Sequence, residues 1–330
     1  RSIKTIMRQD REPYRVPRRV QDVIPIQCVW PDGIFKVGIK FSKTYRFTDI
    51  NYKVASRNDK ETMFLAYSEL PNSLDCAATT KLTICNRRQS QADFEQSVLM
   101  PMQEDGLDKY RREYNQMLMD KATGANGITQ EKYVTITVYK RDIEDARAYF
   151  ARIGADLTAR FALGSKCGEL DATDRLRILH DFYRAGDEGN FHFDMADMAR
   201  KGHDFKDYIC PDGIEKHSDY LKLGDRYCRV LFLKDYANYI QDEIVTNLTD
   251  LDRNMMLSID ILNVPTDEAV REVENRLLGV ETNITNWQRR QNQNNNFSAI
   301  VPYDMELQRR ESKEFLADLT TRDQRMMQAV

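Results

Sequence analysis

A phosphate-binding loop requires glycines and a lysine at fixed spacing. In a P-loop, Gly-x-x-x-x-Gly-Lys-Ser/Thr, backbone N–H groups surround the phosphates and the lysine reaches the β- and γ-phosphates. No glycine of this chain is followed by a lysine. The acidic pair Asp242-Glu243 lies in a helical pattern, whereas Walker B acids end an apolar strand. The sequence therefore predicts no ATP hydrolysis by this chain, no catalytic residue and no bound cofactor.

Histidine and carboxylate side chains could instead hold a metal ion. The candidate ligands lie close together in the sequence and are His192, Asp194, Asp197, His203 and Asp204. They show neither the HExxH motif nor another tight ligand spacing, and no GxSxG motif indicates a nucleophilic serine. We therefore predict no metal site, and we keep an enzyme centred on His192 as an alternative.

The bulk composition is typical of a globular chain with a charged surface. Its 330 residues leave room for about two domains, and 41% of them are apolar. The net charge of −3 gives no overall attraction to nucleic acid. No run approaches the roughly 18 apolar residues of a membrane span, and no apolar segment near the start predicts a signal peptide. The six cysteines have no zinc-ligand spacing, so we expect reduced thiols.

Two parts of the chain resemble each other. Pro31-Asp32-Gly33-Ile34 recurs as Pro211-Asp212-Gly213-Ile214, an offset of 211 − 31 = 180 residues. Three further matches follow in the same order at a similar offset, including Tyr45 with Tyr227 and Leu82-Thr83-Ile84 with Leu257-Ser258-Ile259. A period this long indicates duplicated domains and not a solenoid. We therefore predict an α+β fold of two related tandem modules, with largely antiparallel sheets packed by helices.

Local patterns predict the elements of each module. In the first copy, Pro31-Asp32-Gly33 is a turn between two strands. The alternating segments in both copies predict further strands, and periodic apolar positions predict helices. The predicted strands are 24–30, 34–39, 44–47, 78–85, 132–139, 214, 220–223, 227–233 and 255–264. The predicted helices are 58–70, 90–99, 107–121, a helix that Asp142 caps, a helix that Thr173 caps, 235–248, 266–290 and 304–325.

These elements divide the chain into four parts. Residues 1–20 form a basic arm, residues 21–163 the first α+β module, residues 164–210 a helical connector and residues 211–330 the second module. The second module ends in a helical hairpin over 266–325. It lacks the strand and helix that close the first module, so we expect the chain to be part of a longer protein.

Two surfaces are candidates for interaction. The apolar faces of the predicted hairpin must be buried on their own module, on another domain or on another subunit. The residues expected to contribute there are Leu277, Leu307, Phe315, Leu316 and Leu319. The basic arm could bind anionic lipid or an acidic partner, or it could be a solvated tail. Its candidate residues are Arg8, Arg11, Arg15, Arg18 and Arg19.

Many short runs, in order along residues 20–330, resemble one family. The runs are Val20–Pro25, Asp32–Phe35, Ser42–Tyr52, Asn86–Arg88, Gly106–Asp108, Arg112–Asn115, Ile178–Arg184, Arg229–Leu233 and Leu248–Leu251. Together they are similar to the N-terminal region of conjugation ATPases of the VirB/TrbE/CagE type, in the form carried by conjugative elements of Gram-positive bacteria. None of these runs is a catalytic motif, so no catalytic residue is transferred to this chain.

The resemblance implies a role in type IV secretion. Members of this family are hexamer-forming ATPases, cytoplasmic and peripheral to the cytoplasmic membrane, which bind ATP and Mg²⁺ in a C-terminal RecA-like domain. Their N-terminal region contacts other channel components and the membrane. The resemblance therefore implies an interaction and assembly region, with other type IV secretion components as partners and self-association in the complete ATPase. A nucleic-acid-binding module is the alternative, although the sequence has no basic stripe that would favour it.

Overall fold

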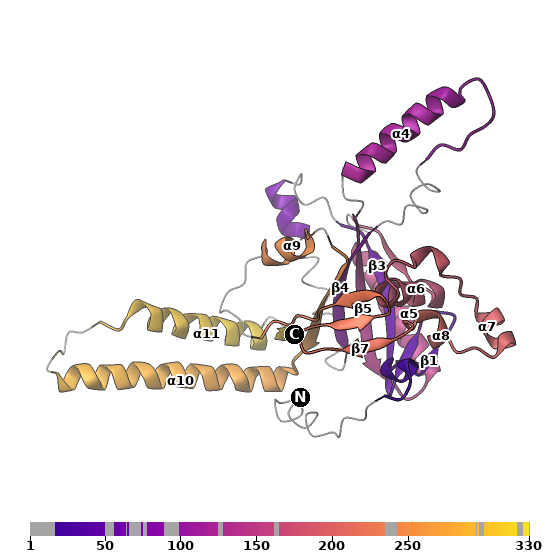
Figure 1. Cartoon of the computed structure of the whole chain (residues 1–330). Helices are drawn as coiled ribbons and strands as arrows, with labels where there is room; N and C mark the ends of the chain where they lie inside the picture. The colour runs from indigo at the N-terminus through magenta and orange to yellow at the C-terminus, as the bar shows by residue number, and fades with distance from the viewer. Residues whose placement is uncertain are drawn as a thin grey trace. The chain divides into compact units, whose positions relative to one another are not determined.

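The computed structural model describes residues 17–49, 56–63, 65, 74, 78–88, 99–124, 128–161, 165–234, 243–251, 253–294, 296, 300–321 and 326–329. The chain forms two compact units, each assembled from three segments (Figure 1). Unit 1 contains Arg1–Ile39, Cys85–Glu131 and Leu170–Met256. Unit 2 contains Lys40–Ile84, Lys132–Glu169 and Leu257–Val330.

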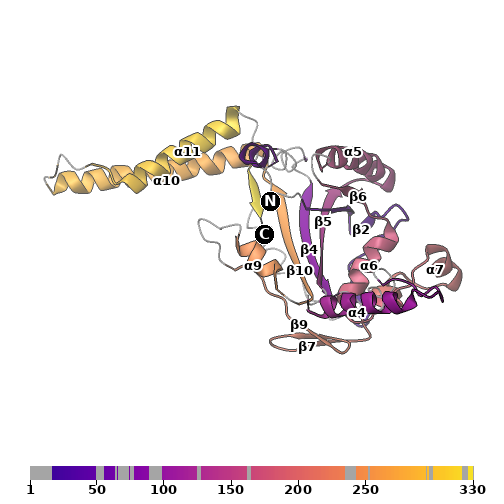
Figure 2. The same ribbon diagram turned by 90° about the horizontal axis from the view of Figure 1, so that it is seen from above.

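A sheet whose strands differ in length forms the centre of unit 2. Its strands follow the order β3-β5-β4-β10-β11, and β6 also pairs with β3. β3 and β5 are antiparallel, with Tyr45 opposite Val134. In Figure 2, β5, β4 and β10 lie side by side. The strands are β3 (Lys40–Phe47), β4 (Thr79–Arg88), β5 (Ile128–Tyr139), β6 (Cys167–Glu169), β10 (Met255–Asn263) and β11 (Met327–Ala329), of which β4, β5 and β10 begin or end in unit 1.

Helix α5 (Ile143–Phe161) packs against β3 and β6. It begins as predicted, since the Asp142 carboxylate accepts a hydrogen bond from the Asp145 N–H at 2.9 Å. Its apolar face is buried, and Phe150 on that face is 1% exposed. Tyr45 is fully buried, and its hydroxyl donates to the Phe150 carbonyl at 3.2 Å. Periodicity therefore identified the core face of this helix correctly.

The predicted turn after Trp30 is present in unit 1. It joins β1 (Cys28–Val29) to β2 (Phe35–Val37) in an antiparallel pair. Gly33 has φ +77°, and its N–H donates to the Trp30 carbonyl at 2.9 Å. A Cβ at Gly33 would lie 2.0 Å from the carbonyl oxygen of Leu170. Glycine is required here both for its φ angle and for the close approach of the two backbones.

The core of unit 1 lies between this β1–β2 pair and short helices. Its buried members are Ile24, Ile26, Phe35, Leu176, Phe205, Ile209 and Cys210. The Arg175 guanidinium stacks 3.8 Å from the Phe35 ring centroid and donates to the Gly33 carbonyl at 2.7 Å. The helical elements are η1 (Val20–Val23), α6 (Ala172–Tyr183), η2 (Glu188–Asn190), α7 (Met195–Lys201) and α8 (Lys206–Ile209).

Unit 1 also contains a small separate sheet of three antiparallel strands. β7 (Ile214–Lys216), β8 (Leu221–Leu223) and β9 (Arg226–Cys228) follow the order β7-β8-β9. Two further helices are α4 (Asp108–Gly124) and α9 (Glu243–Thr249). The predicted strand 227–233 is too long, because β9 ends at Cys228 and residues 229–234 have no regular secondary structure.

The predicted helical hairpin is present in unit 2. Helix α10 (Thr266–Gln293) lies beside α11 (Tyr303–Thr321), as Figures 1 and 2 show. A strand that the sequence analysis did not expect follows it. β11 pairs antiparallel with β10, and Met327 lies opposite Asn263. The expectation that the hairpin is followed by no strand is therefore wrong. In β10-α10-α11-β11, as in β4-α4-β5, helical structure lies between two strands of the sheet.

The α+β class with antiparallel sheets and a helical hairpin is confirmed. The two units do not coincide with the predicted modules, because residues 21–163 and 211–330 each contribute to both units. Strands Leu82–Cys85 and Leu257–Ile261, the proposed equivalents, belong to β4 and β10, which are neighbours in one sheet. Strands that are far apart in the sequence can pair through their backbones, so a sequence repeat does not determine which segments form one compact unit. The duplication itself stays a prediction.

Two local predictions in the connector need correction. Asp171, and not Thr173, caps α6, since its carboxylate accepts the Asp174 N–H at 2.8 Å. The connector also contributes β6, which pairs with β3. The predicted helix at 90–99 lies almost wholly outside the described residues, as does the first part of 235–248. Of the predicted helix 58–70, residues 58–63 and 65 are described and helical, and the rest lies outside the described residues.

Candidate interaction surface

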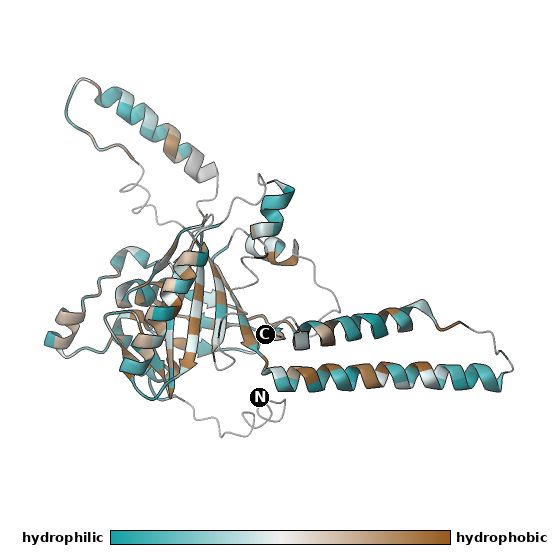
Figure 3. Cartoon of the chain, turned by 180° about the vertical axis from the view of Figure 1, so that it is seen from behind, coloured by the Kyte–Doolittle hydropathy of each residue, from teal (hydrophilic) through white to brown (hydrophobic). Residues whose placement is uncertain are grey.

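The hairpin is built around a seam on α10. The least exposed positions along the middle of this helix are Val273, Leu277, Val280, Ile284 and Trp287. They recur alternately four and three residues apart, which is the spacing of side chains that face a neighbouring helix. Figure 3 shows the same pattern, with apolar turns separated by hydrophilic ones along α10.

A matching row runs along α11. Met305, Arg309, Ser312, Leu316 and Leu319 follow the same alternation, and all are less exposed than most of their neighbours. Ser312 is 7% exposed, so a small side chain occupies the middle of the row and leaves space for the facing helix. The two rows account for why α10 and α11 pair.

The base of the hairpin is its best-packed part. Ala269, Val273 and Leu319 form a buried cluster, and Val264 and Met326 pack against it from the two ends of the hairpin. The Val264 N–H also donates to the Met326 carbonyl at 2.9 Å. The hairpin is therefore joined to the β10–β11 pair by apolar contacts and by backbone hydrogen bonds.

The five predicted interface residues have different environments. Leu319 is 3% exposed within this cluster, and Leu316 packs against it. Leu277 and Leu307 are half-buried. Of the five, only Phe315 is classed as exposed, at 38%. The hairpin thus buries most of its apolar side chains on its own unit.

Leu278, an apolar position of the hairpin outside the five predicted interface residues, is 64% exposed. It follows Leu277 directly, and one residue along a helix turns the side chain by about 100°. A heptad alignment of α10 would have separated the two leucines, because only Leu277 falls on the alternating positions. Among the described leucine and phenylalanine side chains of the hairpin, Leu278 and Phe315 are therefore the exposed ones.

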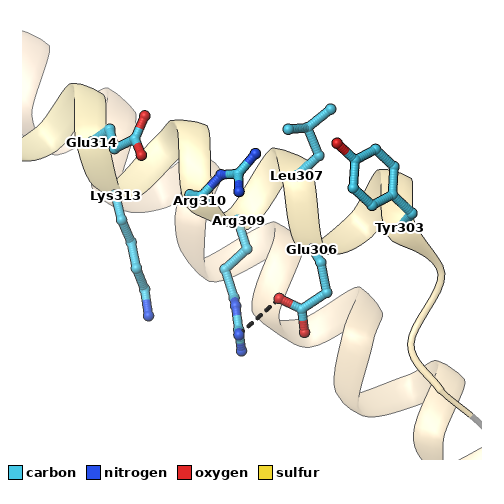
Figure 4. Close-up of a pocket in the computed structure, with 7 residues that line it drawn as sticks. All are labelled: Tyr303, Glu306, Leu307, Arg309, Arg310, Lys313 and Glu314. Atoms are coloured by element: carbon cyan, nitrogen blue, oxygen red, sulfur yellow. Dashed lines mark ion pairs between the residues drawn. The ribbon is translucent and has the colours of Figure 1, made fainter.

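A hollow of about 340 Å³ lies along α11. Its lining residues are Tyr303, Glu306, Leu307, Arg309, Arg310, Lys313 and Glu314. In Figure 4, Tyr303, Leu307 and Arg310 lie along one side of the helix, while Arg309 turns toward Glu306. Arg309 pairs with Glu306 at 2.8 Å, and Tyr303 is 71% exposed. An aromatic ring beside cations suits a peptide surface better than an enclosed small-molecule site.

The structure places only part of the basic arm. Arg18 and Arg19 are exposed. The Arg19 N–H donates to the Asp22 carboxylate at 3.2 Å, at the start of η1. Arg8, Arg11 and Arg15 lie outside the described residues, so lipid binding by the arm stays a prediction.

Three of the five residues of the metal alternative line a second hollow, in unit 1, of about 420 Å³, whereas His203 and Asp204 do not. His192, Asp194 and Asp197 are there together with Phe193 and Tyr208. Over the part of the chain that the structure describes, no three His, Cys, Asp or Glu side chains are grouped so that they could hold a metal ion. Phe193 and Tyr208 contact edge to face, with centroids 5.2 Å apart.

The carboxylates beside this hollow have structural partners. Asp194 caps α7 and accepts hydrogen bonds from the N–H groups of Asp197 and Ala196. These bonds, with the one from Asp197 strongest, lower the pKa of Asp194 below its ordinary value. The Asp197 carboxylate pairs with Arg200 and lies 3.5 Å from Lys201. The cluster in the sequence is thus explained by helix capping and ion pairs, and we do not propose an active site there.

A strongly exposed apolar segment lies where the sequence analysis predicted a strand and a family-like run. Val230, Leu231, Phe232 and Leu233 are 72, 82, 81 and 58% exposed, respectively. They follow β9 directly in unit 1. The strand prediction assigned them to a sheet, which is why they were not considered as a surface.

A comparison with models of protein families and with curated proteins found no match. Among the helices of the described segments, none has the length and apolar character needed to span a bilayer.

Proposed function

We propose that this chain is the N-terminal interaction and assembly region of a type IV secretion traffic ATPase. In this role it docks the ATPase to the channel components at the inner side of the cytoplasmic membrane. The single observation that supports the proposal is the ordered series of family-like runs between residues 20 and 330. The ATP and Mg²⁺ sites of such an ATPase belong to its RecA-like domain, and we assign no turnover and no nucleic-acid binding to this chain.

Several of these runs occupy positions where their residues have a clear structural task. Gly33 in the run Asp32–Phe35 allows the close approach to Leu170. Tyr45 in the run Ser42–Tyr52 is fully buried beneath α5. Asn86 donates from its side-chain amide to the Thr249 carbonyl at 2.5 Å, which connects two further runs within unit 1. Runs that maintain a fold are what a shared interaction region would preserve.

The docking surface that we assign to the hairpin comprises its exposed apolar side chains Phe315 and Leu278. Substitution of Leu316 and Leu319 would not test it, because these residues pack within unit 2. The double variant Leu278→Asp/Phe315→Asp removes the outward apolar side chains and leaves the seam intact. Glu274→Gln, at an exposed position of α10, is the matched control.

The test uses the complete ATPase in donor cells of a conjugative element. We expect the Leu278→Asp/Phe315→Asp variant to reduce transfer frequency at least about tenfold, the effect of about 1.4 kcal/mol of lost binding. Circular dichroism of the purified variant should be unchanged, and Glu274→Gln should transfer normally. Normal transfer by the double variant would exclude Leu278 and Phe315 from the docking surface. Absence of Gly-x-x-x-x-Gly-Lys-Ser/Thr from the sequence encoded after Val330 would exclude the family itself.

A further inference from the structure

Residues 229–234 combine two properties that are rarely found together on a surface. The four apolar side chains from Val230 to Leu233 are all more than half exposed. Isolated exposed apolar residues are common, whereas contiguous ones usually mark a binding site. Tyr227, in strand β9 just before the segment, is also 73% exposed.

Among the described residues, the backbone of this segment also has no hydrogen-bond partner. β9 pairs with β8 on one side only and is an edge strand of the β7-β8-β9 sheet. Within the described chain, no backbone–backbone hydrogen bond involves residues 229–234. An edge with free N–H and C=O groups is a template for another strand.

The charges at the two ends of the segment have no ion-pair partner in the part of the chain that the structure describes. Arg229 donates from Nε to the Asp219 carbonyl at 2.9 Å, but neither Arg229 nor Lys234 forms an ion pair with a described residue. A partner that matches the segment end to end therefore needs acidic residues on both sides of its apolar centre.

We propose that residues 229–234 are a strand-addition site. The occupant is an extended apolar segment of a partner protein, flanked by acidic residues, which pairs with the chain that continues β9. Main-chain hydrogen bonds supply the affinity in this mode, and alternate side chains supply the specificity. The inference depends on exposure, hydrogen bonding and charge in unit 1 and does not require the family assignment.

Two other occupants fit less well. If two copies of the segment paired with each other, the cations at positions 229 and 234 would lie opposite cations in either orientation, and like charges directly opposite each other are destabilising. Insertion into a bilayer would carry unpaired backbone groups into hydrocarbon, where each costs several kcal/mol. A strand from a partner satisfies both the backbone and the charges.

The first experiment titrates the chain with a labelled synthetic peptide, Glu-Val-Thr-Val-Thr-Glu, and follows fluorescence anisotropy. Its two glutamates are five positions apart, as Arg229 and Lys234 are (234 − 229 = 5), so both can lie opposite a cation in one register. We expect saturable binding, and binding at least about fivefold weaker when both glutamates are replaced by lysine. Phe232→Asp should abolish binding, whereas Ile300→Asp, a change at a similarly exposed aliphatic residue in unit 2, should not affect it. Equal binding of the Glu and Lys peptides, or no binding at about 1 mM, the weak limit of useful affinity, would overturn the proposal.

A proline scan tests the strand geometry. Proline removes one N–H, and alternate residues of an edge strand direct their N–H toward the new partner. We therefore expect one alternating pair, Val230 and Phe232 or Leu231 and Leu233, to lose peptide binding on substitution by proline while the other pair retains it. Uniform loss or uniform retention across the four variants would contradict strand addition.

Two further measurements separate the other occupants. Sedimentation equilibrium that shows a dimer abolished by Phe232→Asp would replace the proposed partner with a second copy of the chain. Co-sedimentation with phosphatidylglycerol vesicles that is lost in Phe232→Asp, without peptide binding, would replace it with a lipid surface. A monomer that binds the acidic peptide and does not bind vesicles through Phe232 supports the proposal.

Discussion

The α10–α11 hairpin and the segment 229–234 both carry large apolar side chains, but they differ in how much of them is buried. In the hairpin, Val273, Ile284 and Leu319 are at most 5% exposed. In the segment, Leu231 and Phe232 are more than 80% exposed. The amount of apolar sequence is therefore a poor guide to which region binds a partner.

The difference follows from what each kind of backbone requires. A helix satisfies its own N–H and C=O groups and needs only a neighbour for its side chains. α10 obtains that neighbour from α11, which begins shortly after it in sequence. An extended segment needs the backbone of another strand, and within the described chain residues 229–234 have none. The capacity to bind a further strand thus remains where backbone pairing is incomplete.

The largest expected effect is at the base of the hairpin. Leu319→Ala removes a side chain that is 3% exposed and packs with Ala269 and Val273. We expect the free energy of unfolding to fall by about 2–5 kcal/mol, the usual cost of a buried leucine. Urea denaturation followed by circular dichroism measures it. Leu278→Ala, exposed on the same hairpin, is the control and should change stability by less than about 0.5 kcal/mol.

A smaller effect is expected along the seam. Ile284 is 5% exposed and lies farther from the β10–β11 pair than Val273 in the sequence of α10. We expect Ile284→Ala to cost about 2 kcal/mol, at the low end for a buried isoleucine, because two helices can close over a cavity more readily than a full core. An unchanged urea midpoint would mean that α10 and α11 are not paired at this point in solution, and the contrast with segment 229–234 would fail.

Much of the fold was predictable because it rests on local patterns. The turn at Gly33, strand β3, the Asp142 cap and the apolar face of α5 all follow from residue type and spacing. The paired helices α10 and α11 follow from periodicity in the same way. These elements are long, or they depend on a residue with a specific backbone requirement.

Strands β6 and β11 could not be predicted in this way. Each has three residues, Cys167–Glu169 and Met327–Ala329, and neither shows an alternating pattern long enough to recognise. Both exist because a distant strand accepts them, β3 for the first and β10 for the second. The prediction of a strand over 227–233 was wrong for the opposite reason. Its sequence is β-rich, but beyond Cys228 it has no strand to pair with in the described part of the chain.

The candidate surface was only partly predictable. The sequence identified Leu316 and Leu319 as apolar positions of a helix, but it could not show that they face their own unit. It also could not distinguish Leu277 from Leu278 without the position of α11. Which side of a helix is covered depends on the neighbour, and the neighbour is a property of the tertiary structure.

A weak effect is expected from the ion pair that joins the two helices. Lys313 and Glu281 lie 3.8 Å apart, and both side chains are about half exposed. Solvent screens such a pair, so Lys313→Gln should change the free energy of unfolding by less than about 1 kcal/mol. Urea denaturation at low and high salt measures the change. A larger loss that disappears in salt would show that charge, and not the apolar seam, holds the hairpin together.

The smallest effect on stability is expected in segment 229–234. The Phe232 side chain is 81% exposed, so Phe232→Asp removes little buried surface and should change the free energy of unfolding by less than about 0.5 kcal/mol. The same variant should reduce the fluorescence of an apolar dye such as ANS bound to the native chain, because it divides the apolar run with a charge. Leu278→Asp removes one isolated apolar side chain and should leave dye binding nearly unchanged. A Phe232→Asp variant that is strongly destabilised would mean that the segment is packed in solution, and the distinction between a self-covered hairpin and an uncovered strand edge would be lost.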